Sequence, residues 1–356
     1  MQIQIARGGS ANCSSCFETG DTELGGDASG LGNCPVYHAL PLWMPGALRQ
    51  VPALLLGSVA RFGLDDFAEK GHVEKTAGRA FNCHPPHQRP RCSRDNTGDA
   101  VMRRNKIKQM WRDGKYVTLG WLSVSHGFTA EIMARQGFDA LCVDLQHGTA
   151  ELKDVWPMLQ AISQTDTVPV VRVAWNEPAT IMKALDLGAY GVIVPLVNTA
   201  EEAAMAVAAC RYPPAGMRSS GPVRAMHYGG ADYVAHANDE IVVMAMIETK
   251  KGLANLDAIC ATPGLDAVYI GPADLSFALG LVPRGDNPDP VHLSTCDKIR
   301  ETAHKHGIKA AMHCASASFA AGAVKRGFDM VMLTSDLSCM IAGARLQLDE
   351  LKAKTA

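Results

Sequence analysis

From residue 102 to the C-terminus, short apolar runs alternate with longer segments of helical periodicity. Each run is four to eight residues long and is bordered by glycine, proline or charged residues, which is typical of strands buried on both faces of a parallel sheet. The pattern predicts eight strands, at 118–123, 140–144, 168–173, 191–195, 241–248, 267–270, 309–313 and 330–333.

Amphipathic segments lie between these runs and predict helices, among them 129–136, 152–163, 178–187, 200–211 and 316–326. Glycine precedes a predicted strand at four places, Gly137, Gly188, Gly264 and Gly327. Glycine tolerates the left-handed conformation in which many helices end, so these residues predict helix C-caps.

Eight strand–helix repeats predict an α/β fold with a parallel sheet and right-handed crossovers. Residues 102–356 number 255, close to the roughly 250 typical of a (β/α)8 TIM barrel. The alternative is an open doubly wound sheet, whose first strand usually leads into a glycine-rich phosphate turn. Ser123 to Gly127 follow the first strand instead, and the chain has no dinucleotide or P-loop fingerprint.

The first 101 residues differ from the rest because they show no sustained period of 2 or 3.6. Glycine, serine and proline clusters predict a poorly structured extension without a core of its own. Either the natural chain starts at Met102, or the extension has a regulatory or metal-binding role. A zinc site would draw on Cys13, Cys16, Cys83, His84, His87 and Cys92, but the gap after Cys16 is long for a compact zinc module.

The composition excludes several classes of protein. A net charge of −2 is not that of a protein with a broad basic face for nucleic acid. No run of eighteen apolar residues predicts a membrane span, and no secretory signal is evident. With these features absent, the eleven cysteines are expected to be reduced thiols in a cytoplasmic protein.

Charged residues follow several predicted strands, at positions that a barrel brings to one rim. Asp144 ends the second strand and His147 follows it, Arg172 lies near the end of the third, Glu248 ends the fifth and Asp274 follows the sixth. Active sites of TIM barrels lie at the carboxyl ends of the strands. We therefore expect these five residues to form the active site.

Glu248 and Asp274 are candidate ligands of a divalent cation. A carboxylate that ends an apolar strand is costly unless it is paired, and two carboxylates with open positions suit Mg²⁺ or Mn²⁺. The alternatives are a salt bridge for Glu248 and a helix N-cap for Asp274. The backbone N–H groups of Ala273 and Asp274 open a helix and could hold a substrate carboxylate.

Arg172 and His147 are the candidates for charge stabilisation and proton transfer. The planar guanidinium suits a carboxylate or enolate oxygen, although Arg172 could equally pair with Asp144 or Glu248. The imidazole of His147 suits proton transfer near neutral pH, although it could simply bond within its loop. Asp186, on the following helix, could orient His147, but from the residues alone it is more simply an exposed helix charge.

Five segments together resemble the HpcH/HpaI aldolase family, the metal-dependent class II pyruvate aldolases. They are Val143-Asp-Leu-Gln-His-Gly, Pro169-Val-Val-Arg-Val-Ala-Trp-Asn-Glu-Pro, Arg211-Tyr-Pro-Pro-Ala-Gly-Met-Arg, Ile247-Glu-Thr and Ile270-Gly-Pro-Ala-Asp-Leu-Ser. The resemblance extends from about Met102 to the C-terminus and implies a TIM barrel of the phosphoenolpyruvate/pyruvate type.

The resemblance also implies roles for individual residues. His147 would be the general base with Asp186 as its partner, Arg172 would stabilise the transition state, and Asp144 would belong to the catalytic group. Glu248 and Asp274 would hold Mg²⁺, Mn²⁺ or Co²⁺. Substrate contacts would come from Arg172, Gly271, Ala273 and Asp274. The substrates would be a 2-oxo acid and an aldehyde, and the chain would form a homo-oligomer, a hexamer in the family, by exchanging its last helix.

Two positions depart from the family pattern. Gln146 stands where many members have glutamate, and Met246 stands where the family has a substrate-contacting glutamine. The second change puts the usual substrate in doubt. The alternatives are an acyl-CoA lyase similar to the citrate lyase β chain, for which no basic cluster is evident, and a non-catalytic binding barrel, against which the retained charged residues argue.

Overall fold

Eight parallel strands close into a barrel in the computed structural model, which describes residues 102–355. Neighbours in the sequence are neighbours in the barrel, and β1 pairs with β8 to close it. The predicted (β/α)8 fold is confirmed, and every predicted strand boundary falls within two residues of the observed one. The strands are β1 Val117–Leu122, β2 Ala140–Asp144, β3 Val168–Arg172, β4 Gly191–Val194, β5 Val242–Ile247, β6 Ala267–Ile270, β7 Lys309–His313 and β8 Met330–Ser335.

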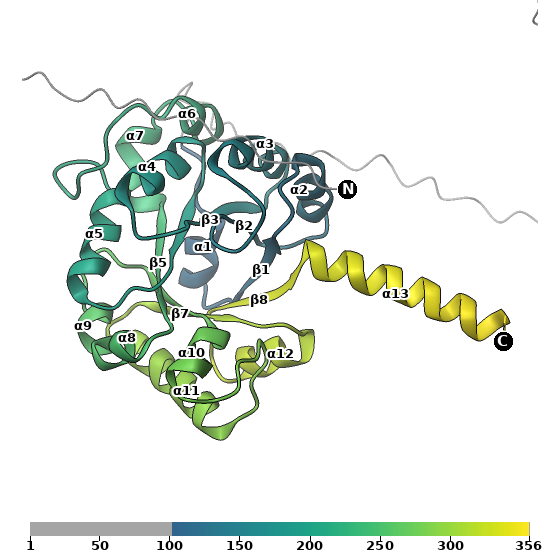
Figure 1. The fold of residues 1–356 in the computed structure, drawn as a ribbon. Helices are drawn as coiled ribbons and strands as arrows, with labels where there is room; N and C mark the ends of the chain where they lie inside the picture. Colours follow the sequence, from purple (N-terminus) through teal and green to yellow (C-terminus); the bar gives the residue numbers. More distant parts are fainter. Residues whose placement is uncertain (1–101, 356) are drawn as a thin grey trace, which may run out of the picture. The chain divides into compact units, whose positions relative to one another are not determined.

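Helices surround the strands in an outer layer (Figure 1). Within the described residues they are α1 Lys106–Arg112, α2 Gly127–Ala134, α3 Leu152–Ile162, α4 Pro178–Asp186, α5 Ala200–Cys210, α6 Val223–Gly229, α7 Tyr233–Glu240, α8 Lys250–Ala254, α9 Leu256–Cys260, α10 Pro272–Ala278, α11 Pro290–Lys305, α12 Ala317–Lys325 and α13 Asp336–Thr355. The five helices named from the sequence correspond to α2, α3, α4, α5 and α12.

The four glycines predicted to precede strands all have positive φ. Their values are 93° at Gly137, 100° at Gly188, 82° at Gly264 and 90° at Gly327. This region is costly for a residue with a Cβ, so glycine allows the chain to reverse between helix and strand at little cost.

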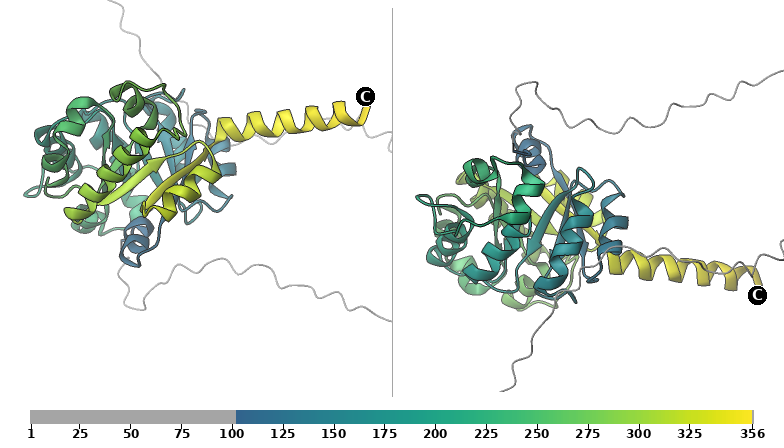
Figure 2. Two further views of the ribbon diagram at one scale, coloured as in Figure 1. Left: turned by 90° about the horizontal axis from the view of Figure 1, so that it is seen from below. Right: turned by 90° about the horizontal axis from the view of Figure 1, so that it is seen from above.

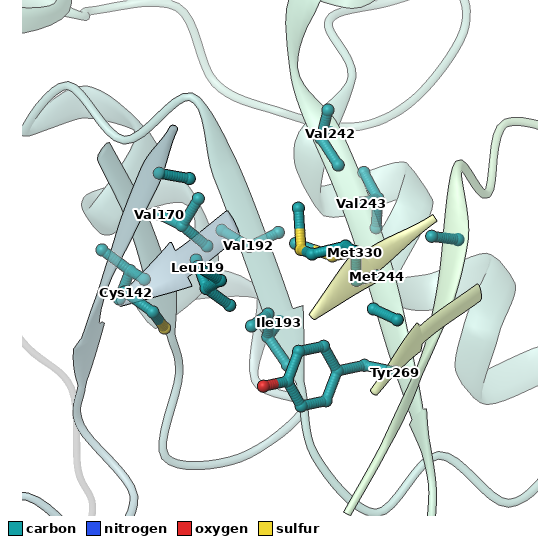
Figure 3. Close-up of a cluster of buried hydrophobic side chains, with 14 of the residues drawn as sticks. Leu119, Cys142, Val170, Val192, Ile193, Val242, Val243, Met244, Tyr269 and Met330 are labelled. Carbon is teal, nitrogen blue, oxygen red and sulfur yellow. The ribbon is translucent and has the colours of Figure 1, made fainter. Parts of the chain in front are cut away.

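The barrel interior is filled by apolar side chains from successive strands, so it is a packed core and not a pore. Figure 3 shows side chains of several strands meeting there, among them Leu119, Val170, Val192, Met244 and Tyr269, each fully buried. Burial of a large aliphatic side chain contributes about 1.5–3 kcal/mol, so this interior is the main source of stability for the barrel.

Asp336 joins the end of the barrel to its beginning. Its carboxylate accepts hydrogen bonds from the backbone N–H groups of Ser123, at 2.9 Å, and Val124, at 3.1 Å. It is also the first residue of α13, which runs away from the barrel in all three views (Figures 1 and 2). Asp336 is the only buried residue of this 20-residue helix.

The residues considered for a zinc site lie before residue 102 and so fall outside the described residues. No helix within residues 102–355 has both the length and the apolar character needed to cross a membrane.

Candidate active site

The carboxyl ends of the strands surround a cavity of about 320 Å³. Six of the eight predicted site residues line it: His147, Arg172, Glu248, Gly271, Ala273 and Asp274. Its other walls come from Trp121, Ser123, Met246, Pro272, Gly285, His313, Cys314, Ala315, Met332, Thr334, Ser335 and Ser338. Asp144 lies directly behind Arg172, whereas Asp186 is not part of the cavity.

A fixed guanidinium forms one wall of the cavity. Nε and Nη2 of Arg172 donate to the two carboxylate oxygens of Asp144 at 2.8 and 2.7 Å. The guanidinium also lies 4.7 Å from the ring centre of Trp121, whose Nε1 donates to Asp144 as well. Among the described residues Nη1 of Arg172 has no hydrogen-bond partner, so it is free for a ligand.

The Asp144 carboxylate is fully engaged by these contacts. Burial alone would raise the pKa of Asp144, but the hydrogen bonds and charge of Arg172 hold it below its usual value. The pairing of Arg172 with Asp144, one of the alternatives considered from the sequence, is therefore real. It orients the guanidinium without withdrawing it from the cavity, because Arg172 still lines the wall.

Glu248 is a buried carboxylate that is only partly satisfied. It is 2% exposed, and Oε1 accepts the backbone N–H of Leu196 at 2.9 Å. Leu196 has a φ of 55°, an uncommon conformation for a residue with a branched side chain. Among the described residues no salt bridge reaches Glu248, so the salt-bridge alternative is wrong.

The second oxygen of Glu248 faces Gly271. A Cβ at position 271 would collide with Oε2 and would lie 2.9 Å from Cε of Met246. Burial raises the pKa of Glu248 to about 7, and the nearby Asp274 carboxylate adds to the increase. Without a counter-charge, this carboxyl therefore takes up a proton near neutral pH.

Asp274 lies in the first turn of α10, and the N-cap of this helix is Gly271. The N-cap alternative for Asp274 is therefore wrong, and its exposed carboxylate is available to a ligand. The first backbone N–H groups of a helix have no partner within it, and at the start of α10 these belong to Ala273 and Asp274.

The donor set fits a hard divalent cation. Oε2 of Glu248 and the carboxylate of Asp274 are two potential oxygen ligands in one cavity, and the positive charge of a cation between them would oppose the effect of burial on the pKa of Glu248. Within residues 102–355 no cluster of three or more acidic, histidine or cysteine side chains is placed to hold a metal. Water or substrate oxygens would have to supply the remaining ligands.

His147 is an exposed residue in the loop after β2, three strands away from Glu248 in the barrel order, and it lines the same cavity. Its backbone N–H lies 3.4 Å from Oδ1 of Asp144, and that of Gln146 lies 3.0 Å from the same atom. No hydrogen bond holds the imidazole among the described residues, so it is available to a substrate proton.

Asp186 is the last residue of α4, and it accepts a hydrogen bond from Nη2 of the buried Arg218 at 2.9 Å. Helices of this fold return antiparallel to the strands, so the end of α4 lies away from the rim that carries His147. One chain therefore does not bring Asp186 to His147, and the predicted pairing stays a prediction.

Sequence analysis missed three aromatic residues of the site: Trp121, Tyr269 and His313. The ring of Trp121 lies 4.9 Å from that of His313, and the hydroxyl of Tyr269 lies 3.0 Å from His313 Nδ1. His313 ends β7, and a histidine at the carboxyl end of an apolar barrel strand is a signal that could have been used.

Residues 118–342 match the model of the HpcH/HpaI aldolase/citrate lyase family. The chain belongs to this family. Over 249 residues it is 40% identical to a hydroxypyruvate/pyruvate aldolase of Rhizorhabdus wittichii, covering 70% of this chain and 99% of that protein. Over 241 residues it is 36% identical to a 5-keto-4-deoxy-D-glucarate aldolase of Escherichia coli, covering 67% and 93%.

A solved structure agrees with this assignment. It is that of an HpcH/HpaI aldolase/citrate lyase family protein from Burkholderia cenocepacia, with a TM-score of 0.65 and 30% identity over 70% of this chain and 99% of that one. The resemblance noted from the sequence is confirmed, and the chain is an enzyme of the carbon–carbon lyase type.

Proposed function

We propose that this enzyme is a divalent-cation-dependent aldolase that cleaves a 4-hydroxy-2-oxo acid to a pyruvate-type product and an aldehyde, and that catalyses the reverse addition. The observation that carries the proposal is the buried Glu248 carboxylate, which shares one cavity with Asp274 and with the fixed guanidinium of Arg172. The similarity to named pyruvate-type aldolases supports it.

Glu248 and Asp274 would hold the cation. Mg²⁺, Mn²⁺ or Co²⁺ would act as a Lewis acid that polarises the 2-oxo group of the substrate. The N–H groups of Ala273 and Asp274, which have no partner within α10, support binding of the substrate carboxylate beside this site.

The side chains of the cavity would carry out the proton and charge transfers. His147 takes the proton of the 4-hydroxyl group, the bond between C3 and C4 breaks, and the aldehyde leaves with the carbonyl at C4. The electron pair of that bond forms the enolate of the 2-oxo acid. Arg172 stabilises the oxygen charge through its free Nη1, and Asp144 and Trp121 keep the guanidinium in place.

We also propose that the chain acts as a homo-oligomer through α13. The exposed helix carries an apolar stripe that suits a second copy of the chain. A second copy is also required for the predicted role of Asp186 as the positioning partner of His147, since one chain holds these residues at opposite ends of the barrel.

Retro-aldol assays with Mg²⁺ or Mn²⁺, with and without EDTA, test the function. We expect cation-dependent release of pyruvate from 4-hydroxy-2-oxo acids, and a loss on the order of 100-fold or more in Glu248→Gln. Absence of turnover across a panel of aldehydes in the addition direction would refute the aldolase proposal. Full activity of Glu248→Gln would refute the cation site alone.

A further inference from the structure

His313 is a polar group in the cavity wall that the proposed chemistry does not use. It ends β7, and its ring packs edge-on against Trp121 at 4.9 Å. Nδ1 lies 3.0 Å from the hydroxyl of Tyr269, a fully buried residue of β6. These two neighbours hold the imidazole in one orientation at the edge of the cavity.

The contact with Tyr269 sets the tautomer of His313. Burial raises the pKa of the Tyr269 phenol well above its usual value, so the hydroxyl keeps its proton and needs an acceptor. Its hydrogen-bond partner among the described residues is Nδ1 of His313, so Tyr269 donates to Nδ1 and the proton of the imidazole lies on Nε2.

The free nitrogen of His313 is therefore a donor. Burial lowers the pKa of His313 to about 4, with a further decrease from Arg172, so the ring is neutral in the working range of most enzymes. Nε2 has no hydrogen-bond partner among the described residues. Because His313 lines the cavity, this neutral N–H suits an uncharged oxygen acceptor of a ligand bound there.

The rest of the cavity argues against a second carboxylate on the substrate. Arg172 is the only lysine or arginine among the described residues that line it, and two of its nitrogens are bound to Asp144. Glu248 and Asp274 add negative charge. In contrast, four hydroxyl-bearing residues line the same space, and Ser335 Oγ donates to Ser338 Oγ at 2.8 Å; they are Ser123, Thr334, Ser335 and Ser338. A hydroxyl substituent matches these walls better than an anion does.

We propose that His313 is a specificity-determining residue, whose Nε2–H donates to a hydroxyl group of a short, hydroxylated substrate that carries no second carboxylate. The inference rests on the proposed aldolase function and narrows its substrate class. The hydroxyl can belong to either of the two reactants: C3 of the 2-oxo acid, as in hydroxypyruvate, or the carbon next to the aldehyde, as in glycolaldehyde.

Matched substrate pairs identify the source of the hydroxyl. Hydroxypyruvate is compared with pyruvate against a constant aldehyde, and glycolaldehyde with propionaldehyde against a constant 2-oxo acid. We expect kcat/KM to be roughly tenfold or more higher for the hydroxylated member of one pair, the size of effect that one hydrogen bond accounts for. Succinic semialdehyde, an anionic aldehyde, should be poorer than glycolaldehyde.

Two variants assign the preference to His313. His313→Phe keeps an aromatic ring but removes the donor, and it should abolish the preference, because kcat/KM falls more for the hydroxylated member of the pair than for its deoxy counterpart. His313→Gln keeps an N–H near the position of Nε2 and should retain part of the preference. His236→Phe, a change at a half-exposed histidine of α7, is the matched control.

Equal losses of kcat/KM for both members of each pair in His313→Phe would overturn the proposal. A wild-type enzyme that shows no preference, or that favours succinic semialdehyde, would overturn it too.

A binding measurement separates this inference from the proposed function. With ¹⁵N-histidine-labelled enzyme and Mg²⁺, the hydroxylated ligand should shift the Nε2 resonance of His313, and its deoxy counterpart should not. This shift is measurable even if no turnover is found, and its absence with both hydroxylated ligands contradicts the hydroxyl contact.

Discussion

At the scale of single residues, Glu248 combines burial with an incomplete set of partners. One oxygen accepts the N–H of Leu196 and the other faces the cavity beside Gly271. Such a carboxyl is stable as the neutral acid, or as the anion beside a cation. Proton and cation therefore compete for the same group.

This competition gives a pH dependence of stability in the cation-free enzyme. The pKa of Glu248 is about 7 in the folded chain against an ordinary 4.5, so the unfolded chain releases this proton first. The contribution of this protonation to the free energy of unfolding is fully present below pH 4.5 and is lost as the pH rises through 7. It amounts to on the order of 3 kcal/mol. Urea unfolding in EDTA between pH 5 and 8 should show wild type losing stability relative to Glu248→Gln, and parallel curves would contradict the expectation.

The absence of a side chain at Gly271 makes room for the carboxylate of Glu248. Gly271→Ala places a Cβ against Oε2 and must displace the carboxylate. We expect kcat/KM to fall on the order of tenfold to a hundredfold with a fold that is retained, and the affinity for Mn²⁺ to fall as well. Steady-state kinetics and Mn²⁺ titration measure both. Gly322→Ala, in α12 where an added Cβ meets no atom within 4 Å, is the control and should leave activity unchanged.

The charged residues of the site could be predicted because a charge at the end of an apolar strand is visible in the sequence. Trp121 and His313 were missed, because an aromatic residue within or ending a strand is indistinguishable from a core residue until its neighbours are known. The N–H of Leu196 could not be predicted at all, since its role depends on a backbone conformation that its residue type disfavours.

At the scale of secondary structure elements, α13 combines 20 residues with a single buried one. Leu346 lies on the opposite face of this helix, but the other five of its six exposed large apolar side chains are separated by three, four or seven residues, which places them on one face. They are Leu337, Met340, Ile341, Leu348 and Leu351, all exposed. Helices of this kind owe most of their stability to packing, so this face is expected to be covered by a second copy.

A charge on that face should dissociate the oligomer. Met340→Glu places a carboxylate within the apolar stripe, and we expect the mass measured by light scattering to fall toward that of one chain, because an unpaired charge is costly to bury. Ala342→Glu introduces the same charge on the opposite face and should leave the mass unchanged. A wild-type enzyme that is monomeric at micromolar concentration would rule out the proposed assembly.

The main elements could be predicted because apolar strands and amphipathic helices have clear periods, and glycine marks their junctions. The short helices α8 and α9 have five residues each, too few to show a helical period in the sequence. Asn255 is both the C-cap of α8 and the N-cap of α9. The position of Asp186 could not be predicted, since it depends on the end of the barrel to which α4 returns.

At the scale of the whole molecule, residues 102–356 are proposed to be a self-contained catalytic unit. Met102 and Asn105 are already buried in the barrel, and the N–H of Asn105 donates to Glu240 at 2.6 Å. A chain that starts at Met102 should retain the circular dichroism of a folded α/β protein, and kcat/KM within about threefold of the full chain. A large loss of turnover would show that the first 101 residues contribute to the site.

Closure of the barrel has a consequence for how the protein is made. The bonds from Ser123 and Val124 to Asp336 connect residues 213 and 212 positions apart. A ribosome adds residues one at a time from the N-terminus, so β1 must wait for almost the entire chain before it gains its second neighbour. Until then its edge is open to pairing with other chains. Nascent chains halted before β8 should therefore be aggregation-prone and protease-sensitive, and resistance should appear only after Asp336 has left the exit tunnel.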